Sequence, residues 1–320
     1  MPKIDHIVQA SGVSRSTVFR YLAGKAVRPG AAAAIERAQR LLQAAPGTGP
    51  AETRDYLVSV VPTYTRFRGY AEVLEGVLQR VHETGGAVRI GGYQARAPLP
   101  SGVILVGKNL VDEEAELDEW KQRGVPCVLV NRIPDEAERS WVAVDCRRAA
   151  REAVTHLIGQ GCRRIAVWID ELSRVSRDKK RGYCDALTEA GLPVDHALVV
   201  DPSVQTLDQT LTVLLSAENP PDGWFSPDDE IAAQVISFAS ARGLSVPRDL
   251  AVVGMNDIAT AAHLVPSLSS VRLPFRTMGG AAVDALDRLI EKPQELSVRI
   301  LMNHELIVRD SSRRRGSSNL

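Results

Sequence analysis

Several features that would indicate other classes of protein are missing from this sequence. The four cysteines are widely spaced and form no CxxC pair, so the sequence predicts neither a zinc knuckle nor a disulfide framework. No basic N-terminal segment precedes an apolar run, which argues against a secretory signal. The longest apolar runs, such as 56–61, have the length of a strand and are too short to cross a membrane. We therefore expect a cytoplasmic protein with no membrane partner.

The motifs of common catalytic sites are also missing. The histidines are scattered without an HExxH pattern, and there is no GxSxG elbow, no P-loop and no GxGxxG. Asp228-Asp229-Glu230 could suggest a metal site. However, three acidic residues at the start of a helix more often compensate the helix dipole. We expect no enzymatic activity, no metal and no cofactor.

The net charge of the whole chain is zero, but it is unevenly distributed. Residues 1–50 contain seven basic and two acidic side chains, a charge of +5. Of the 39 basic and 39 acidic residues in the chain, 32 and 37 remain for the rest, a charge of −5. A basic head on an acidic body is typical of a protein in which only the head binds phosphate groups.

The pattern of residues 1–46 predicts a helical head. Short amphipathic helices are expected over 4–11, 15–22 and 31–42, with Val18 and Leu22 of the second one pointing inward. Gly12 favours the left-handed stop of the first helix, and Ser14 can cap the second. A glycine turn before a helix with basic and hydroxyl residues is typical of a helix-turn-helix that enters the major groove. The alternative is a small bundle with a solvated polar face.

The segment KIDHIVQASGVSRSTVFRYLAGK, residues 3–25, resembles the head of the LacI/GalR family of bacterial regulators. The resemblance implies that Arg15 and Ser16 read bases and that Thr17 and Arg20 lie beside the DNA backbone. Phe19 stands in place of the usual serine, Ala23 in place of asparagine, and 31–32 in place of Thr-Arg, so we expect weaker phosphate contacts. The expected DNA-binding residues are Ser14, Arg15, Ser16, Thr17, Phe19 and Arg20.

The linker 47–55 departs further from the family pattern. Members of this family usually have a short hinge helix here, whose leucine enters the minor groove. Gly47 replaces the asparagine of that helix and Thr53 falls where the leucine should be. Glycines and prolines oppose a helix, so we expect a flexible linker instead.

Residues 56–310 alternate between strand and helix patterns, which predicts doubly wound parallel sheets in an α/β body. Strand-like runs occur at 56–61, 87–90, 102–106, 126–130, 165–169, 197–200, 223–226, 250–253 and 270–272. Helical periodicity fits 70–82, 113–123, 147–158, 179–189, 207–217, 230–241 and 278–290.

The family resemblance continues through this body, in segments such as GVILVG, SPDDEIA, RDLAVVGMNDIA and HELIVRDS. It implies two lobes similar to periplasmic sugar-binding proteins. The N-lobe would comprise 56–146 and 274–292, and the C-lobe 147–273 and 293–310, with crossings near 145–147, 272–275 and 292–294. We expect 311–320 to be a disordered tail.

One helix of the usual N-lobe is expected to be missing. Only residues 91–101 separate the second and third predicted strands, and a helical crossover needs a dozen or more. The N-lobe should therefore be smaller than usual.

Ligands of doubly wound folds bind beyond the carboxyl ends of the strands. Position by position, the resemblance implies an effector site formed by Tyr70, Asn131, Arg132, Lys179, Asp228 and Asn256. Sugar-binding members usually have Arg, Asn and Asp at the last three positions. The rearranged charges predict a polar pocket of altered specificity, for a hydroxyl-rich or amine-bearing molecule.

The leading hypothesis is a homodimeric regulator, most often a repressor in this family, that binds a palindromic operator in double-stranded DNA under the control of a small-molecule effector. One alternative is the solute-binding protein of a transporter, which the basic head disfavours. Another is a regulator whose effector pocket has been lost. An enzyme on an α/β fold is disfavoured by the missing catalytic motifs.

Overall fold

The computed structural model describes residues 4–32, 34–35, 54–60, 68–92, 98–106, 110–136, 138–294 and 297–314. The chain divides into two compact units, Met1–Arg54 and Asp55–Leu320, which we describe separately. Nearly all of the expected linker, and with it the expected lack of a hinge helix, lies outside the described residues.

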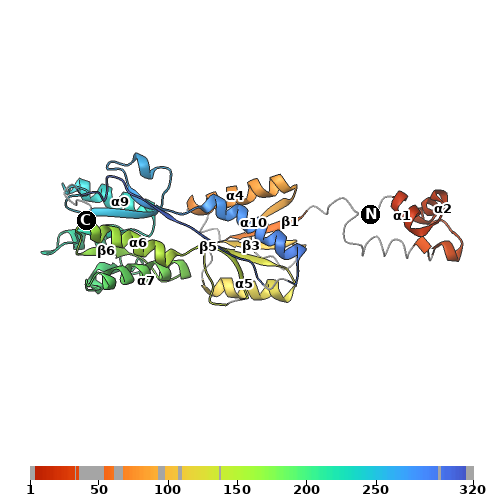
Figure 1. Cartoon of the computed structure of the whole chain (residues 1–320), viewed down its shortest axis with the longest axis horizontal. Helices are drawn as coiled ribbons and strands as arrows, with labels where there is room; N and C mark the ends of the chain where they lie inside the picture. Colours follow the sequence, from red (N-terminus) through yellow and green to blue (C-terminus); the bar gives the residue numbers. More distant parts are fainter. Residues whose placement is uncertain are drawn as a thin grey trace. The chain divides into compact units, whose positions relative to one another are not determined.

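The first unit is a small helical head (Figure 1). It contains α1 (Ile4–Ser11) and α2 (Arg15–Leu22), and residues 29–32 and 34–35 are also helical. Ile7, Val18 and Ile35 are buried against one another. Tyr21 packs against this core, whereas Leu22 is exposed, so the expectation that Leu22 points inward was wrong. The buried stripe of α2 follows the i, i+3 spacing rather than i, i+4.

The second unit has two lobes, each built on a six-stranded sheet. The N-lobe sheet has the order β11-β5-β4-β3-β1-β2, and its strand pairs are parallel. Its strands are β1 (Asp55–Val60), β2 (Ala87–Gly91), β3 (Gly102–Val106), β4 (Cys127–Val130), β5 (Ser140–Val144) and β11 (Arg299–Met302). Helices α4 (Arg68–Thr84) and α10 (Phe275–Glu291) cover one face, and α5 (Leu110–Gln122) covers the other (Figure 1).

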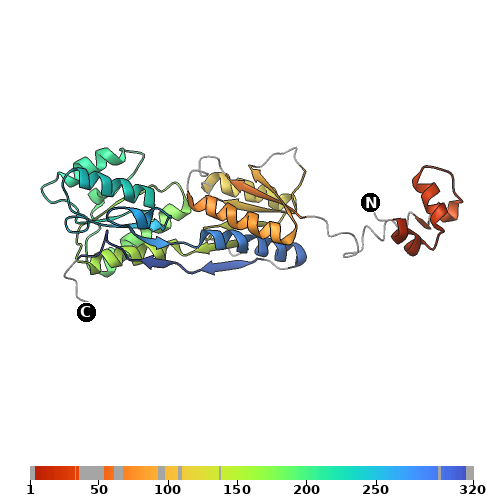
Figure 2. The same ribbon diagram turned by 90° about the horizontal axis from the view of Figure 1, so that it is seen from above.

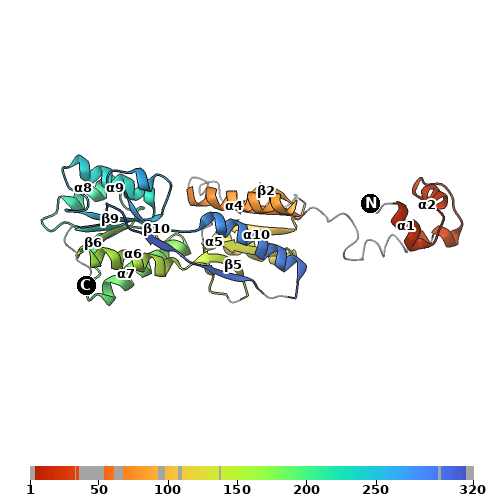
Figure 3. The same cartoon turned by 45° about the horizontal axis from the view of Figure 1, so that its top comes forward.

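The C-lobe sheet has the order β12-β10-β9-β8-β6-β7, and only the β10–β12 pair is antiparallel. Its strands are β6 (Ile165–Trp168), β7 (Val199–Val200), β8 (Gly223–Phe225), β9 (Ala251–Asn256), β10 (Ser269–Arg272) and β12 (Glu305–Ile307). Helices α6 (Cys146–Gly159) and α7 (Arg174–Glu189) lie on one face, and α8 (Leu207–Leu215) and α9 (Asp229–Ala241) lie on the other (Figure 3). The predicted fold class, a helical head and two doubly wound α/β lobes, is confirmed.

The chain passes between the lobes three times, and the last passage differs from the expectation. β11 belongs to the N-lobe sheet and β12 to the C-lobe sheet, so the chain crosses at 303–304 rather than at 292–294 (Figure 2, blue). Residues 293–310 are therefore not all part of the C-lobe. The expectation of a disordered tail from residue 311 was wrong for its first residues, because Ser311 and Ser312 are buried and Ser311 bonds to the backbone of Val252. Residues 315–320 of the expected tail lie outside the described residues.

The β2–β3 connection contains no helix in its described residues, 92 and 98–101. On the face of the N-lobe sheet that α5 covers, Leu57 and Leu105 pack against Trp120 of α5. Beside them a hollow of about 300 Å³ is lined by Leu57, Trp120 and Leu99 among others. The described ends of the β2–β3 connection, which include Leu99, thus border this hollow.

Two neighbouring glycines of α10 allow a stability test of the close α4–α10 packing. A Cβ at Gly279 would lie 2.1 Å from the carbonyl oxygen of Val73 in α4, whereas at Gly280 the nearest atom is 3.8 Å away. We expect Gly279→Ala to lower the free energy of unfolding by about 1–3 kcal/mol because the helices must separate. Gly280→Ala should be neutral or stabilising, since alanine favours a helix over glycine. Urea denaturation measures the free energy of unfolding of both variants. Equal values for the two would show that the α4–α10 packing tolerates a methyl group at Gly279 without loss of stability.

Candidate functional site

The head presents one helix with a polar surface. Gly12 adopts the left-handed conformation, with φ of +66°, and the Ser14 side chain accepts a hydrogen bond from the backbone N–H of Thr17, at 3.4 Å. The buried Val18 fixes α2 in the head. Of the six expected DNA-binding residues, Thr17 is half-buried and the others are exposed: Ser14, Arg15, Ser16, Phe19 and Arg20.

Phe19 is an unusual member of this surface. Its side chain is 62% exposed on α2, although burying an aromatic ring is strongly favourable. In a major groove such a ring can pack against the methyl group of thymine. Arg20 also has a structural contact, because its Nη2 donates to the carbonyl oxygen of Ala26 at 3.2 Å.

The second unit contains a cavity of about 330 Å³, within the usual size of a small-molecule site. Five of the six expected effector residues line it, and they come from both lobes: Tyr70, Asn131, Lys179, Asp228 and Asn256. Arg132 is buried but does not line the cavity. Asn131 directly follows β4, and Asn256 is the last residue of β9. Tyr70 and Lys179 lie in the first two turns of α4 and α7, and Asp228 caps α9.

Sequence reasoning missed the apolar part of this cavity. Trp168 at the end of β6 and Phe275 at the start of α10 line it, and so do Leu172 and Ile231. Trp168 falls within the predicted strand 165–169, and Phe275 at the predicted lobe crossing 272–275. The polar residues thus lie beside apolar and aromatic surfaces, which is typical of a site for a small molecule with a ring.

Two polar residues of the cavity, Asp228 and Asn256, form hydrogen bonds within the C-lobe. Asp228 caps α9, accepting from the backbone N–H of Glu230 at 2.7 Å, and also accepts from Nδ2 of Asn256 at 3.1 Å. Asn256 has a φ of +114°, a strained value of the kind that clusters at functional sites.

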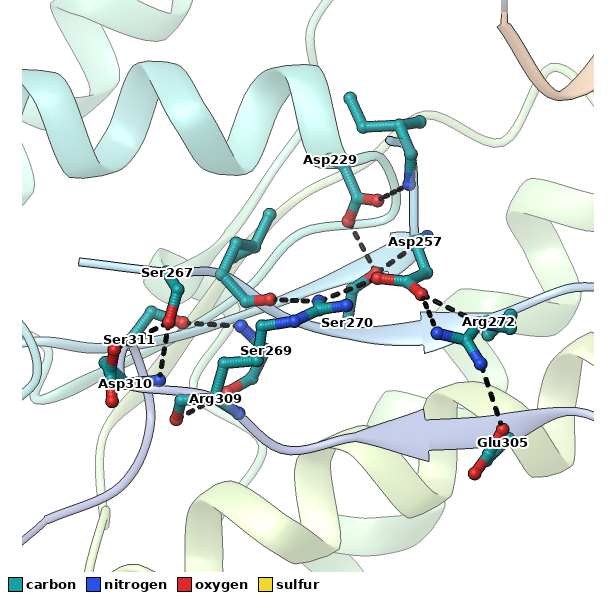
Figure 4. Close-up of polar contacts among 12 residues, drawn as sticks. Asp229, Asp257, Ser267, Ser269, Ser270, Arg272, Glu305, Arg309, Asp310 and Ser311 are labelled. Carbon is teal, nitrogen blue, oxygen red and sulfur yellow. Dashed lines mark hydrogen bonds and ion pairs between the residues drawn. The ribbon is translucent and has the colours of Figure 1, made fainter. Parts of the chain in front are cut away.

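A polar network begins at Asp229, the residue after the cavity residue Asp228 (Figure 4). Asp229 is fully buried and accepts from the Ser270 hydroxyl at 2.6 Å and from the Ile258 N–H at 2.8 Å. Gly254 leaves room for this carboxyl, since a Cβ there would lie 2.1 Å from Oδ1. Ser270 in turn accepts from the N–H of Asp257, whose carboxylate binds Arg272 and Arg309. The network therefore runs from the start of α9 to β10, next to a lobe crossing.

The pKa of Asp229 is raised to about 7, mainly by burial, although the hydrogen bonds from Ser270 and Ile258 lower it. The neighbouring carboxylates Asp228 and Asp257 contribute to the increase. An unfolded aspartate has a pKa near 3.9. The folded state therefore binds a proton more tightly, and stability falls as the pH rises from about 4 to 7. This loss amounts to as much as about 4 kcal/mol.

We therefore expect Asp229→Asn to remove part of the pH dependence of stability. The free energy of unfolding of the wild type, measured relative to this variant, should fall between pH 4 and pH 7 and stay level above pH 7. Urea denaturation at several pH values provides the comparison. A constant difference across that range would mean that Asp229 is ionised throughout.

An ion pair connects the two lobes at the edge of the cavity. Arg174, next to the cavity residue Ser173 at the start of α7, donates to Glu114 of the N-lobe at 3.1 Å and to Asp135 of the same lobe. The guanidinium of Arg174 lowers the pKa of Asp135. Because Glu114 and Asp135 are exposed, these contacts join the lobes but contribute little to stability.

Comparisons with known proteins bear on the whole chain. The profile of the periplasmic binding protein-like domain matches residues 140–312. The HTH-type transcriptional regulator CelR of Thermobifida fusca is 30% identical over 97% of this chain and 98% of its own length. This chain belongs to the LacI family of transcription regulators.

Solved structures agree with the LacI-family assignment. A complex of the transcriptional regulator CelR with cellobiose superposes with a TM-score of 0.72 at 26% identity, covering 97% of this chain and 100% of that one. A LacI-family regulatory protein from Chloroflexus aggregans superposes with a TM-score of 0.70 at 25% identity, covering 81% of this chain and 98% of that one. Such relatives are transcription regulators rather than enzymes.

Two further observations concern the described part of the chain. It contains no group of histidine, cysteine and acidic side chains arranged to hold a metal ion. Each of its helices is also too short or too polar to span a lipid bilayer.

Proposed function

We propose that this LacI-family regulator is a cytoplasmic repressor that binds a palindromic operator as a homodimer. Its operator affinity is set by a small-molecule effector in the cavity between the lobes, and it acts by binding rather than by catalysis. The observation that carries the proposal is the presence, in one chain, of a helix with exposed basic residues, α2, and a two-lobed unit with a polar cavity.

In the head, Arg15 and Ser16 are the proposed base readers, and Thr17 and Arg20 the proposed backbone contacts. The positive charge of residues 1–50 supports this division, because phosphate contacts supply most of the affinity for DNA. Phe19 adds an apolar contact that selects thymine by its methyl group.

In the second unit, Tyr70, Asn131, Lys179, Asp228 and Asn256 are the proposed effector contacts, with Arg132 supporting Asn131 from the next position. The cellobiose bound to CelR supports a sugar-sized effector for this chain too. A regulator that had lost its pocket is the second candidate, since the described residues of the β2–β3 connection form no crossover helix, but the retained cavity of about 330 Å³ disfavours it.

Selection of duplexes from a random pool by the purified full chain tests the proposal. We expect an enriched palindrome, with two chains per duplex in analytical ultracentrifugation, because two-fold symmetric proteins bind two-fold symmetric sites. Failure to enrich any sequence, or one chain on an asymmetric site, would contradict it.

A further inference from the structure

Lys179 brings a positive charge into the cavity without a partner of opposite charge. The residue is only 9% exposed, and its Nζ donates to the carbonyl oxygen of Pro227 at 2.7 Å. Among the described residues it forms no salt bridge, and no other hydrogen bond of this ammonium group is found. An ammonium has three N–H donors, so two remain for a ligand.

The two carboxylates that line the cavity, Asp228 and Asp170, are stabilised by hydrogen bonds from groups other than Lys179. Both oxygens of Asp228 accept hydrogen bonds, from Glu230 and Asn256, and the N-terminal end of α9 favours its negative charge. Asp170 accepts from the backbone N–H of Leu172 at 2.8 Å. Protein groups thus already stabilise both acids, whereas Lys179 has only a neutral carbonyl.

A buried charge without a counter-ion is costly, and a partner of opposite sign removes part of that cost. Hydrogen bonds between ionised groups are also shorter and stronger than neutral ones. An anionic group on the effector would satisfy the two remaining donors of Lys179. An amine on the effector, by contrast, would meet the ammonium in the same small cavity.

We propose that the effector carries an anionic group, a carboxylate or a phosphate on a sugar-sized molecule, and that this group binds Nζ of Lys179. Its hydroxyl groups then interact with Asp228 and Asn256, and its ring carbons pack against Trp168 and Phe275. The inference rests on the proposed role of the cavity as the effector site. It replaces the sequence-based preference for an amine-bearing molecule.

Matched pairs of neutral and anionic sugars provide the test. The full chain is titrated calorimetrically with D-glucose and D-glucuronate, with D-galactose and D-galacturonate, and with D-glucose 6-phosphate, at constant ionic strength. We expect at least one acid or phosphate to bind at least tenfold more tightly than its neutral counterpart. The sugar acids and the sugar phosphate separate the two sources of negative charge. Inorganic phosphate, compared with chloride in thermal denaturation, should raise the Tm of the wild type.

Variants of Lys179, with a control at the neighbouring Lys180, test whether this ammonium group binds the anion. Lys179→Met keeps much of the length of the side chain but removes the charge, and we expect it to weaken binding of the anion at least tenfold. It should also abolish the phosphate-dependent rise in Tm, whereas Lys179→Arg should retain both effects in part. Thermal denaturation without ligand confirms that the variants are folded. Lys180→Met serves as the control, because Lys180 pairs with Glu171 outside the cavity.

Three results would overturn the inference. The first is equal affinity for the neutral and the anionic sugar of each pair, and the second is no binding or stabilisation by any anion tested. The third is unchanged affinity of Lys179→Met for the anion. Its failure is distinguishable from failure of the proposed function. If an anion binds through Lys179 but leaves operator affinity unchanged, the inference holds and the proposed regulation fails. If a neutral sugar changes operator affinity, the regulation holds and the inference fails.

Discussion

Replacing Asp257 by asparagine will destabilise the second unit by about 3 kcal/mol, the usual cost of removing one partner from a buried ion pair. The Asp257 side chain is only 4% exposed and binds Arg309 at 2.7 Å and Arg272 at 2.8 Å (Figure 4). Without the carboxylate, the largely buried guanidinium of Arg309 loses its counter-ion. Asparagine is the appropriate replacement because Asp257 has a φ of +54°, which asparagine tolerates.

Glu305→Gln is the matched control for this experiment. Glu305 binds the same Arg272, at 3.3 Å, but its side chain is 67% exposed. Exposed ion pairs contribute little to stability, so this variant should behave like the wild type in urea denaturation. Equal losses for Asp257→Asn and Glu305→Gln would show that the buried network does not stabilise the C-lobe.

Arg15→Ala and Arg20→Ala should weaken operator binding in different ways. We expect Arg15→Ala to relax the preference at one base pair per half-site, at a cost of about 1–3 kcal/mol there, because an arginine can bond to both acceptors of a guanine. Arg20→Ala should weaken binding to every sequence similarly and reduce the salt dependence by about one charge.

Fluorescence anisotropy with the selected operator and its single-base variants, over a range of salt concentrations, separates the two roles. Circular dichroism must accompany Arg20→Ala, since Arg20 also bonds to the carbonyl of Ala26 within the head. Equal losses of Arg15→Ala on every operator variant would assign Arg15 to the backbone instead.

Much of this fold could be predicted because long apolar runs alternate with amphipathic helices. Three strands were missed: β5 (Ser140–Val144), β11 (Arg299–Met302) and β12 (Glu305–Ile307). β11 alternates between exposed and half-buried residues at a sheet edge, and β12 has only three residues. Because β11 was not recognised, the third lobe crossing was placed ten residues too early.

The positions of the polar cavity residues could also be predicted, since they follow strands or begin helices. The sequence could not reveal which hydrogen-bond partners these residues have in the folded protein. Both oxygens of Asp228 are occupied within the C-lobe, and Lys179 has only a carbonyl, yet the sequence shows merely one acid and one base. Trp168 and Phe275 were missed because aromatic residues at these places are equally compatible with a core.

The affinity of the selected operator for the full chain, measured by anisotropy with and without the anionic sugar that binds best, tests the central claim directly. That claim is that the cavity of the second unit controls DNA binding by the head. We predict at least a tenfold change in operator affinity for the wild type and little change for Lys179→Met, which should bind the operator normally without ligand. Identical operator affinity with and without a ligand that saturates the cavity would contradict the account.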